Sequence, residues 1–178
     1  MSMLSKNLER LPMYKPMPNW FWELFNIEQQ PKEGEVIKIH DDQFIIIDGI
    51  PRNKLSYSKA QQQTSDTFGF KWKQRDTFEN NEVRNTMRAW ANERYGLATE
   101  WLKQMKSPLV LDAGCGAAFT AIEYFNPIIK DIRYIGADIS DAIDVAYERM
   151  SSLGGDAAFI QSDLTRLPFQ NNTIDIIF

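Results

Sequence analysis

The second half of the sequence predicts an α/β fold built on a parallel β-sheet, and three observations support this prediction. Short apolar runs alternate with helical patterns after Pro108, and an aspartate ends or follows each of three successive runs. A turn that contains two glycines follows the first of these runs. Strands and helices that alternate with short connections are typical of a parallel sheet with right-handed crossovers.

Four strands and two helices account for this half of the chain. The apolar and β-rich runs predict strands over residues 109–112, 133–138, 157–160 and 173–178. A first helix is expected over about residues 118–125. A second helix begins after Ser140, which can cap it, and ends at Gly154-Gly155. Residues 107–178 are therefore expected to form one α/β unit.

A small β-hairpin, over residues 35–51, is expected within the otherwise irregular residues 1–67. The runs 35–39 and 44–47 are rich in β-branched residues and flank a polar turn that contains His40. Asp48-Gly49-Ile50-Pro51 is expected to turn the chain away, which leaves residues 53–67 as a polar linker.

Aromatic and helical patterns fill the rest of the N-terminal region. Residues 20–25 form an aromatic cluster; a lid, a substrate wall or a partner surface are alternatives, but we expect packing on the core. Residues 68–106 are expected to form a helical cap. One helix of this cap begins at Asn81, ends at Tyr95-Gly96 and has an apolar face formed by Val83, Met87, Trp90 and Ala91. The next helix is expected to point inward with Leu97, Trp101, Leu102 and Met105.

Composition excludes several kinds of site. The single cysteine, Cys115, excludes a disulfide framework and a cysteine-based zinc site within one chain. The single histidine, His40, excludes most His-based catalysis, and we expect it to lie exposed in its turn. The apolar runs are shorter than a membrane span, and the first 25 residues lack the apolar core of a signal peptide. We therefore expect a cytoplasmic protein that holds no metal.

Charge is distributed unevenly along the chain, whose net charge is −4. Residues 69–106 contain 8 Lys/Arg and 5 Asp/Glu, whereas residues 107–178 contain 4 and 10. The excess of positive charge in the first segment is small, and we interpret it as a solvated helix face. We expect no nucleic-acid partner, since such proteins usually have a clearly basic domain.

Three aspartates, Asp112, Asp138 and Asp163, follow one another at separations of 26 and 25 residues. Each separation is close to one strand–helix unit, so a parallel sheet brings all three to its carboxyl edge, where open α/β folds bind ligands. Spacing alone leaves three interpretations open: a shared ligand site, a divalent-metal site, and separate turn-capping roles.

The turn after the first strand reads Asp112-Ala-Gly-Cys-Gly-Ala-Ala118. Gly114 and Gly116 let the backbone turn tightly and approach a ligand, and the next helix would direct its first N–H groups toward an anion. A nicotinamide-type fingerprint requires glycine at position 119, where the chain has Phe119. A phosphate-binding Walker loop lacks its Gly-Lys-Ser/Thr. Acids in these positions favour a ligand with an amino-acid end, a ribose diol and an adenine.

These segments resemble the class I S-adenosylmethionine-dependent methyltransferases, in the small-molecule ("type 11") style. The likeness extends over residues 107–178 and consists of ordered motifs at 109–118, 134–140, 158–169 and 173–178. It implies a Rossmann-like sheet of strand order 3-2-1-4, truncated after the fourth core strand. We therefore expect the chain as given to be inactive, with an exposed sheet edge through which it can self-associate.

The resemblance also implies roles for individual residues toward the cofactor S-adenosylmethionine. Gly114 and Gly116 would face its methionine part, and Asp112 would lie near its ammonium group. Asp138 would accept hydrogen bonds from both ribose hydroxyls. Adenine would contact Ile139, Asp163 and Leu164. One departure from the family pattern is Ala118, where a third glycine is usual; we expect it to be tolerated if helix and strand are not too close. Cys115 is interpreted as a small filler.

Upstream segments resemble methyltransferases that carry an N-terminal ribbon, here free of cysteine and therefore of zinc. The similar segments are 44–52, 66–72 and 94–96. The aromatic part of the second, residues 68–72, could cover the cofactor or pack in the core. The implied reaction is methyl transfer to a small-molecule acceptor, with no catalytic residue assignable. Two alternatives are a truncated, non-catalytic binding module and a nicotinamide-dependent oxidoreductase fragment.

Overall fold

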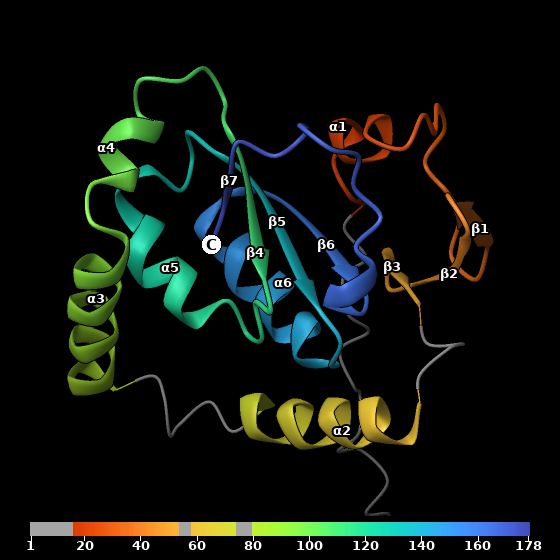
Figure 1. The fold of residues 1–178 in the computed structure, drawn as a ribbon, viewed down its shortest axis with the longest axis horizontal. Coiled ribbons are helices and arrows are strands. Elements are labelled where there is room, and N and C mark those ends of the chain that lie inside the picture. Colours follow the sequence, from red (N-terminus) through yellow and green to blue (C-terminus); the bar gives the residue numbers. More distant parts are fainter. Residues whose placement is uncertain (1–15, 54–57, 74–79) are drawn as a thin grey trace, which may run out of the picture.

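The expected parallel strands form the centre of a seven-stranded sheet in the computed structural model, which describes residues 16–53, 58–73 and 80–178. The sheet order is β1-β2-β3-β6-β5-β4-β7 (Figure 1). Its parallel part, β6-β5-β4-β7, has the predicted order 3-2-1-4, which is confirmed. The strands are β1 (Val36–Ile39), β2 (Asp42–Ile47), β3 (Ile50–Arg52), β4 (Leu109–Ala113), β5 (Arg133–Asp138), β6 (Asp156–Gln161) and β7 (Ile176–Ile177).

Six helices and two short 3-10 turns among the described residues surround this sheet. Helix α3 packs on α5, whereas α6 packs on β5 and β6. Helix α2 contacts α6 and crosses below the ends of the central strands (Figure 1). The elements are α1 (Asn19–Glu23), α2 (Lys59–Lys73), α3 (Asn81–Tyr95), α4 (Ala98–Leu102), α5 (Phe119–Phe125), η2 (Asn126–Ile128), α6 (Ala142–Leu153) and η3 (Leu164–Arg166).

The central strands are apolar on both faces because helices cover both sides of the sheet at this point. In β5 every residue after Arg133 is buried. The strand pairs in register with β4 from Leu109 opposite Arg133, and with β6 up to Asp138 opposite Gln161. This register places the carboxyl ends of β4, β5 and β6 at one edge of the sheet.

The N-terminal hairpin joins this sheet, which corrects the expectation that Asp48–Pro51 turns the chain away. Asp48 and Gly49 have φ values of 53° and 76°, the left-handed pair typical of a tight hairpin turn. Ile50–Arg52 therefore returns as β3, antiparallel to β2 and parallel to β6. The buried Arg52 stabilises this junction, since its guanidinium donates to Gln161 Oε1 and forms an ion pair with Asp144.

Two helix predictions also change. The expected linker of residues 53–67 is wrong for its described C-terminal part, because residues 59–67 belong to α2. The expected inward face after Leu97 is wrong in part: Leu97 is 78% exposed and Trp101 is half exposed, whereas Leu102 is buried. Helix α4 has only five residues, too few to bury a continuous apolar face.

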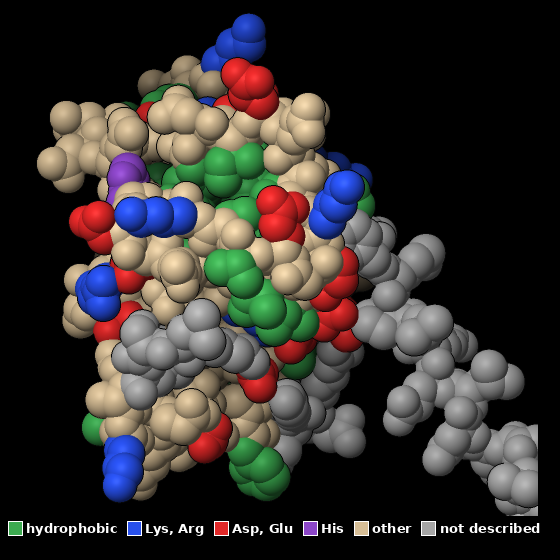
Figure 2. All heavy atoms as spheres, turned by 90° about the vertical axis from the view of Figure 1, so that its right-hand side faces the viewer, with side chains coloured by type: hydrophobic (Ala, Val, Ile, Leu, Met, Phe, Trp, Pro, Cys, Tyr) green, Lys and Arg blue, Asp and Glu red, His purple; other side chains and the backbone are tan. Residues whose placement is uncertain are grey.

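The aromatic cluster of residues 20–25 packs on the core, as expected. Phe21 and Trp22 are buried, and the ring of Phe21 meets the rings of Trp22 and Phe25 edge-on at 5.1 and 5.2 Å. On the hairpin side of the molecule, acidic and basic side chains are interspersed among the described residues (Figure 2). None of the helices in the described ranges is both long and apolar enough to cross a membrane.

Candidate functional site

The three predicted aspartates meet at the carboxyl edge of the parallel sheet. Asp112 lies in β4, Asp138 ends β5, and Asp163 follows β6 after one intervening residue. The backbone N–H of Ser162 donates to the Asp138 carbonyl oxygen at 3.0 Å, which links the ends of β5 and β6. The common edge predicted from their spacing is therefore present in the structure.

The glycine-containing loop after β4 is tied directly to β5. The N–H groups of Gly114 and Cys115 both donate to the carbonyl oxygen of Ala137, at 2.8 and 3.1 Å. Gly114 and Gly116 have φ values of 89° and 51°, a region that side-chain-bearing residues rarely adopt. The Gly116 N–H donates to Asp138 Oδ2 at 2.8 Å, so the loop and the second acid form one unit.

Ala118 occupies the position where the family pattern has a third glycine, and its backbone conformation explains why glycine is favoured there. It has φ 55° and ψ 22°, a left-handed conformation in which a Cβ is unfavourable. We expected tolerance to depend on the distance between helix and strand, but the backbone angle is the feature that disfavours alanine. Ala118 is fully buried and precedes α5, a helix of only seven residues without a side-chain cap.

Asp138 is an anchor of the loop as well as a candidate ligand contact. Its Oδ1 accepts hydrogen bonds from the backbone N–H and the hydroxyl of Ser140, at 2.7 and 2.6 Å. The residue is only 8% exposed, so it is not the open strand-end carboxylate that its position in the sequence suggests. With the Gly116 bond, the carboxylate accepts three hydrogen bonds, and Oδ2 keeps an acceptor position for a further donor.

Asp112 is held in a less polar environment. It is 6% exposed, and its Oδ2 accepts a hydrogen bond from the Tyr134 hydroxyl at 2.6 Å. Burial raises the pKa of Asp112 to about 7; the Tyr134 bond opposes this rise and the nearby Asp138 adds to it. Burial and both carboxylates also raise the pKa of the Cys115 thiol, so this cysteine stays protonated at neutral pH and is no nucleophile.

Asp163, Leu164 and Ile139 form the other end of the edge. Asp163 Oδ1 accepts from the Thr165 N–H at 2.9 Å, and Oδ2 accepts from the amide nitrogen of Gln61. Leu164 is partly exposed, and its Cδ1 lies 3.4 Å from the position that a Cβ on Gly114 would occupy. The structure thus brings Leu164 next to the glycine loop.

Helix α2 contributes four contacts to this edge: sequence reasoning missed those of Gln61 and Ser65, whereas Gly69 and Trp72 lie in the segment 68–72 that it proposed either to cover the cofactor or to pack in the core. Gln61 reaches Asp163, Ser65 donates to the Ile139 carbonyl oxygen at 3.1 Å, and Gly69 lies against Ser140 and Asp141. Trp72 lies on Gly116, where a Cβ would be 2.7 Å from the indole Nε1. Residues 59–67 contain no proline or glycine, and this absence was the available signal for a helix.

A cleft of about 190 Å³ lies beside the glycine loop. One wall is the loop itself with Asp112, and the opposite walls are largely aromatic. Tyr95 and Phe178 lie 4.3 Å apart between ring centroids, and Trp90 meets Tyr95 edge-on at 6.2 Å. The lining residues are Trp72, Trp90, Tyr95, Asp112, Ala113, Gly114, Cys115, Phe119, Thr120, Ala121 and Phe178.

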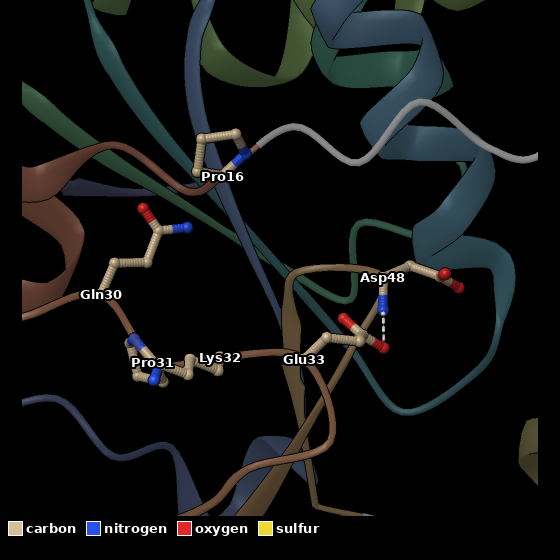
Figure 3. A pocket seen from close by; sticks show the side chains of 6 residues that line it. All are labelled: Pro16, Gln30, Pro31, Lys32, Glu33 and Asp48. Carbon is tan, nitrogen blue, oxygen red and sulfur yellow. Dashed lines mark hydrogen bonds between the residues drawn. The ribbon is translucent and has the colours of Figure 1, made fainter.

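A larger hollow of about 590 Å³ lies near the hairpin and is far less suited to chemistry. Its walls come from Pro16, from the loop before β1 and from the turn at Asp48 (Figure 3). The Glu33 carboxylate already accepts hydrogen bonds from the N–H groups of Asp48 and Gly49, at 2.9 and 3.1 Å. The candidate site is therefore the strand edge, although the hollow is bigger.

The metal interpretation of the three aspartates has no support from their geometry. No group of three or more His, Cys, Asp or Glu side chains within the described ranges is placed to hold a metal ion. Each of the three carboxylates instead accepts hydrogen bonds from protein donors, Asp112 from Tyr134, Asp138 from the loop, and Asp163 from η3 and α2.

Comparison with known proteins gives one family match and several distant structural ones. Residues 110–178 match a family model described as "Methyltransferase domain". No curated protein matches the sequence significantly. Similar solved structures include the MccD protein, with 24% identity and a TM-score of 0.38 over 48% of this chain and 40% of that one.

Two further structures are enzymes by their names. The geranyl diphosphate C-methyltransferase from Streptomyces coelicolor A3(2), in complex with Mg2+, geranyl diphosphate and S-adenosyl-L-homocysteine, is 15% identical with a TM-score of 0.42. The alignment covers 68% of this chain and 54% of that one. The plantazolicin methyltransferase BpumL, in complex with a monoazolic desmethylPZN analog and SAH, is 19% identical with a TM-score of 0.33, over 66% and 49% of the two chains. The chain thus spans 40–54% of the length of these structures.

Proposed function

From the match of residues 110–178 to the methyltransferase-domain family model, we propose that the carboxyl edge of the sheet binds S-adenosylmethionine for transfer of its methyl group to a small molecule. The observation that carries this proposal is the joint position of three acids and the glycine loop at one sheet edge. Open α/β sheets bind their ligands at such an edge.

The residues present fit this cofactor by shape and by donor and acceptor chemistry. The space beside Gly116 exists because no Cβ fills it, so a group can approach the backbone there as closely as the indole of Trp72 does. At the other end Asp163 Oδ2 accepts a hydrogen bond from an amide NH2 group, the kind of donor that the adenine amino group also offers. The half-buried Ile139 lies between these two ends of the edge.

In this proposal each acid has one role. Asp112 lies near the ammonium group of the methionine part, and Gly114 and Gly116 allow that part to approach the backbone. Asp138 accepts hydrogen bonds from the ribose hydroxyls, through the acceptor position on Oδ2 that its bonds to the protein leave open. Asp163 accepts a hydrogen bond from the adenine amino group. When bound, the cofactor supplies an electrophilic methyl group on a positively charged sulfur.

The methyl acceptor is proposed to be a small molecule with an apolar or aromatic portion. The support is the cleft beside Gly114, whose walls opposite the loop carry aromatic rings from α3, from α5 and from Phe178. Such walls hold a flat apolar group by burial and ring contacts. Holding donor and acceptor in line supplies much of the rate in reactions of this type. We assign no catalytic base.

Calorimetric titration with S-adenosylmethionine, S-adenosylhomocysteine and NAD tests the assignment. We expect the first two to bind and NAD not to. Asp138→Ala should weaken binding of S-adenosylhomocysteine by roughly 2–4 kcal/mol, the scale of hydrogen bonds to a charged group. Asp175→Ala is the matched control, because this aspartate accepts the Leu109 N–H at 2.7 Å at the opposite end of β4. Binding of NAD alone would exclude a methyltransferase and favour an oxidoreductase.

A further inference from the structure

Helix α2 lies across the same positions that the proposed cofactor needs. We infer that α2 occupies the nucleoside part of the site in the ligand-free chain, as a built-in competitor that the cofactor must displace. This inference rests on the proposed function and concerns helix α2, which crosses at the carboxyl ends of the central strands (Figure 1).

At the adenine end, Gln61 takes the acceptor that adenine would use. Its amide nitrogen donates to Asp163 Oδ2, while Asp163 Oδ1 is engaged by the Thr165 N–H. An adenine amino group and the Gln61 amide cannot both donate along the same direction to one carboxylate oxygen. Binding of adenine at Asp163 therefore requires Gln61 to leave.

In the middle of the edge, α2 approaches the backbone closely. The Ser65 hydroxyl donates to the Ile139 carbonyl oxygen, and both Ser65 and Gly69 are buried. A Cβ on Gly69 would lie 3.7 Å from the Asp141 nitrogen and 3.9 Å from Ser140 Cβ. The helix thus lies directly over the residue against which adenine is proposed to pack.

At the methionine end, the indole of Trp72 fills the space beside Gly116. A Cβ at Gly116 would lie 2.7 Å from indole Nε1 and 2.9 Å from Cε2. The cofactor is proposed to approach the backbone at this same glycine. One helix therefore contacts the proposed adenine, ribose-flanking and methionine positions at once.

The two phenylalanines of α2 do not attach the helix to the core. Of its described side chains, Phe70 is 69% exposed and Phe68 is also exposed. The buried residues of α2, Ser65 and Gly69, are small, and the half-buried Trp72 lies against Gly116. The hydrogen bonds of α2 to the sheet edge contribute little net stability, because water replaces them when the helix moves away.

A competitor and a wall predict opposite effects of weakening α2. If only molecules with α2 displaced bind the cofactor, the apparent dissociation constant is the intrinsic constant divided by the competent fraction. Removing contacts of α2 then increases that fraction and tightens binding. If α2 is instead a wall of the occupied site, the same change removes contacts to the cofactor and weakens binding.

The test is calorimetric titration of S-adenosylhomocysteine into the wild type, Gln61→Ala, Ser65→Ala and the double variant. We expect the double variant to bind more tightly than the wild type by about threefold to tenfold, as the competent fraction rises. Gln62→Ala is the matched control, because the Gln62 amide bonds only to Asp66 on the exposed side of the same helix among its described contacts. The control should bind like the wild type.

Hydrogen exchange of the wild-type α2 amides gives a second reading that needs no variant. Displacement predicts faster exchange in residues 59–73 when S-adenosylhomocysteine is added, whereas a wall predicts slower exchange. Weaker or unchanged binding by the double variant, or slower exchange, would overturn the inference alone. Absence of binding by every protein, the wild type included, would overturn the proposed function and this inference with it.

Discussion

Asp112 and Asp138 have the same side chain at neighbouring strand ends, but they differ in the donors around them. Asp138 accepts three hydrogen bonds, two from backbone N–H groups and one from a hydroxyl. Asp112 accepts one bond from Tyr134, and its burial raises its pKa to about 7. The charge of Asp112, the first acid of the motif, therefore depends on pH near neutrality.

The raised pKa of Asp112 predicts that the ligand-free protein loses stability as pH rises from about 4 to 7. In this window the folded state keeps the proton, whereas the unfolded chain, with a pKa near 3.8, has lost it. The contribution is fully present below pH 4 and absent above about pH 7. Urea unfolding at a series of pH values should show this slope in the wild type and not in Asp112→Asn, which keeps an acceptor for Tyr134.

Ligand binding should show the opposite trend with pH. A cationic ligand favours the ionised form of Asp112, so affinity for S-adenosylmethionine should rise from pH 5 to about pH 8 and then level off.

The stability prediction has a clear contradicting outcome. If wild type and Asp112→Asn have parallel stability curves between pH 4 and 7, the assignment of the titrating group to Asp112 is wrong.

The contact between α3 and α5 is organised around one buried carboxylate. Glu123 lies in the apolar face of α5, where its two oxygens each accept from an arginine of α3, Arg84 and Arg88, at 2.6 Å. Both arginines are half exposed and the glutamate is buried. The charge on Glu123 is therefore kept in the interior by two partners that reach in from the surface, and the pair orients the helix that carries Trp90.

This geometry predicts a strongly non-additive pair of substitutions. Arg84→Ala or Arg88→Ala alone should cost about 1 kcal/mol, because the remaining arginine still compensates Glu123. The double variant should cost about 3–5 kcal/mol, the effect of leaving a buried charge unpaired. Unfolding in urea measures these free energies, with Lys103→Ala as a control, since its pairing with Glu100 is exposed. Additive effects would show that Glu123 reaches water or protonates instead.

The whole sheet is wider than the segment β6-β5-β4-β7 alone, because β1, β2 and β3 extend it beyond β6. Among the described residues, Arg52 pairs with Gln161 where β3 meets β6, and the Asn53 N–H donates to the Gln161 carbonyl oxygen at 2.9 Å. The guanidinium of Arg52 also contacts Asp144 and the Ile47 carbonyl oxygen. The edge that β6 would otherwise expose is thereby covered. At the other side β7 is the edge strand of the described sheet, and its Ile177 is 65% exposed.

The β7 edge predicts self-association of this chain. Unpaired N–H and C=O groups beside an exposed apolar side chain favour pairing with another sheet, and a lysine on the edge discourages it. Light scattering should find assemblies larger than a monomer for the wild type and a smaller proportion of them for Ile177→Lys. Val36→Lys on the opposite edge strand β1 is the comparison, since Val36 is also exposed. A wild type that stays monomeric at high concentration would contradict this expectation.

The sequence by itself determined the parallel strands and the common edge of Asp112, Asp138 and Asp163, whereas the sheet order was implied by the family resemblance. The strands and their common edge follow from local pattern, since apolar runs, caps and glycines act within a few residues of one another. The family resemblance likewise led us to interpret Cys115 as a filler. The burial of Phe21 and Trp22 was expected because large aromatic side chains gain the most free energy from burial in the core.

Only the tertiary structure decided how distant segments meet. The pairing of β3 with β6, the charge state of Asp112 and the position of α2 over the edge each depend on residues about 20 to 110 positions apart. Polar residues such as Gln61 and Ser65 read as linker because their partners, Asp163 and the Ile139 carbonyl, are not local. Loop closure over such distances costs entropy that contacts across the fold must offset, and these contacts leave no periodic trace in the sequence.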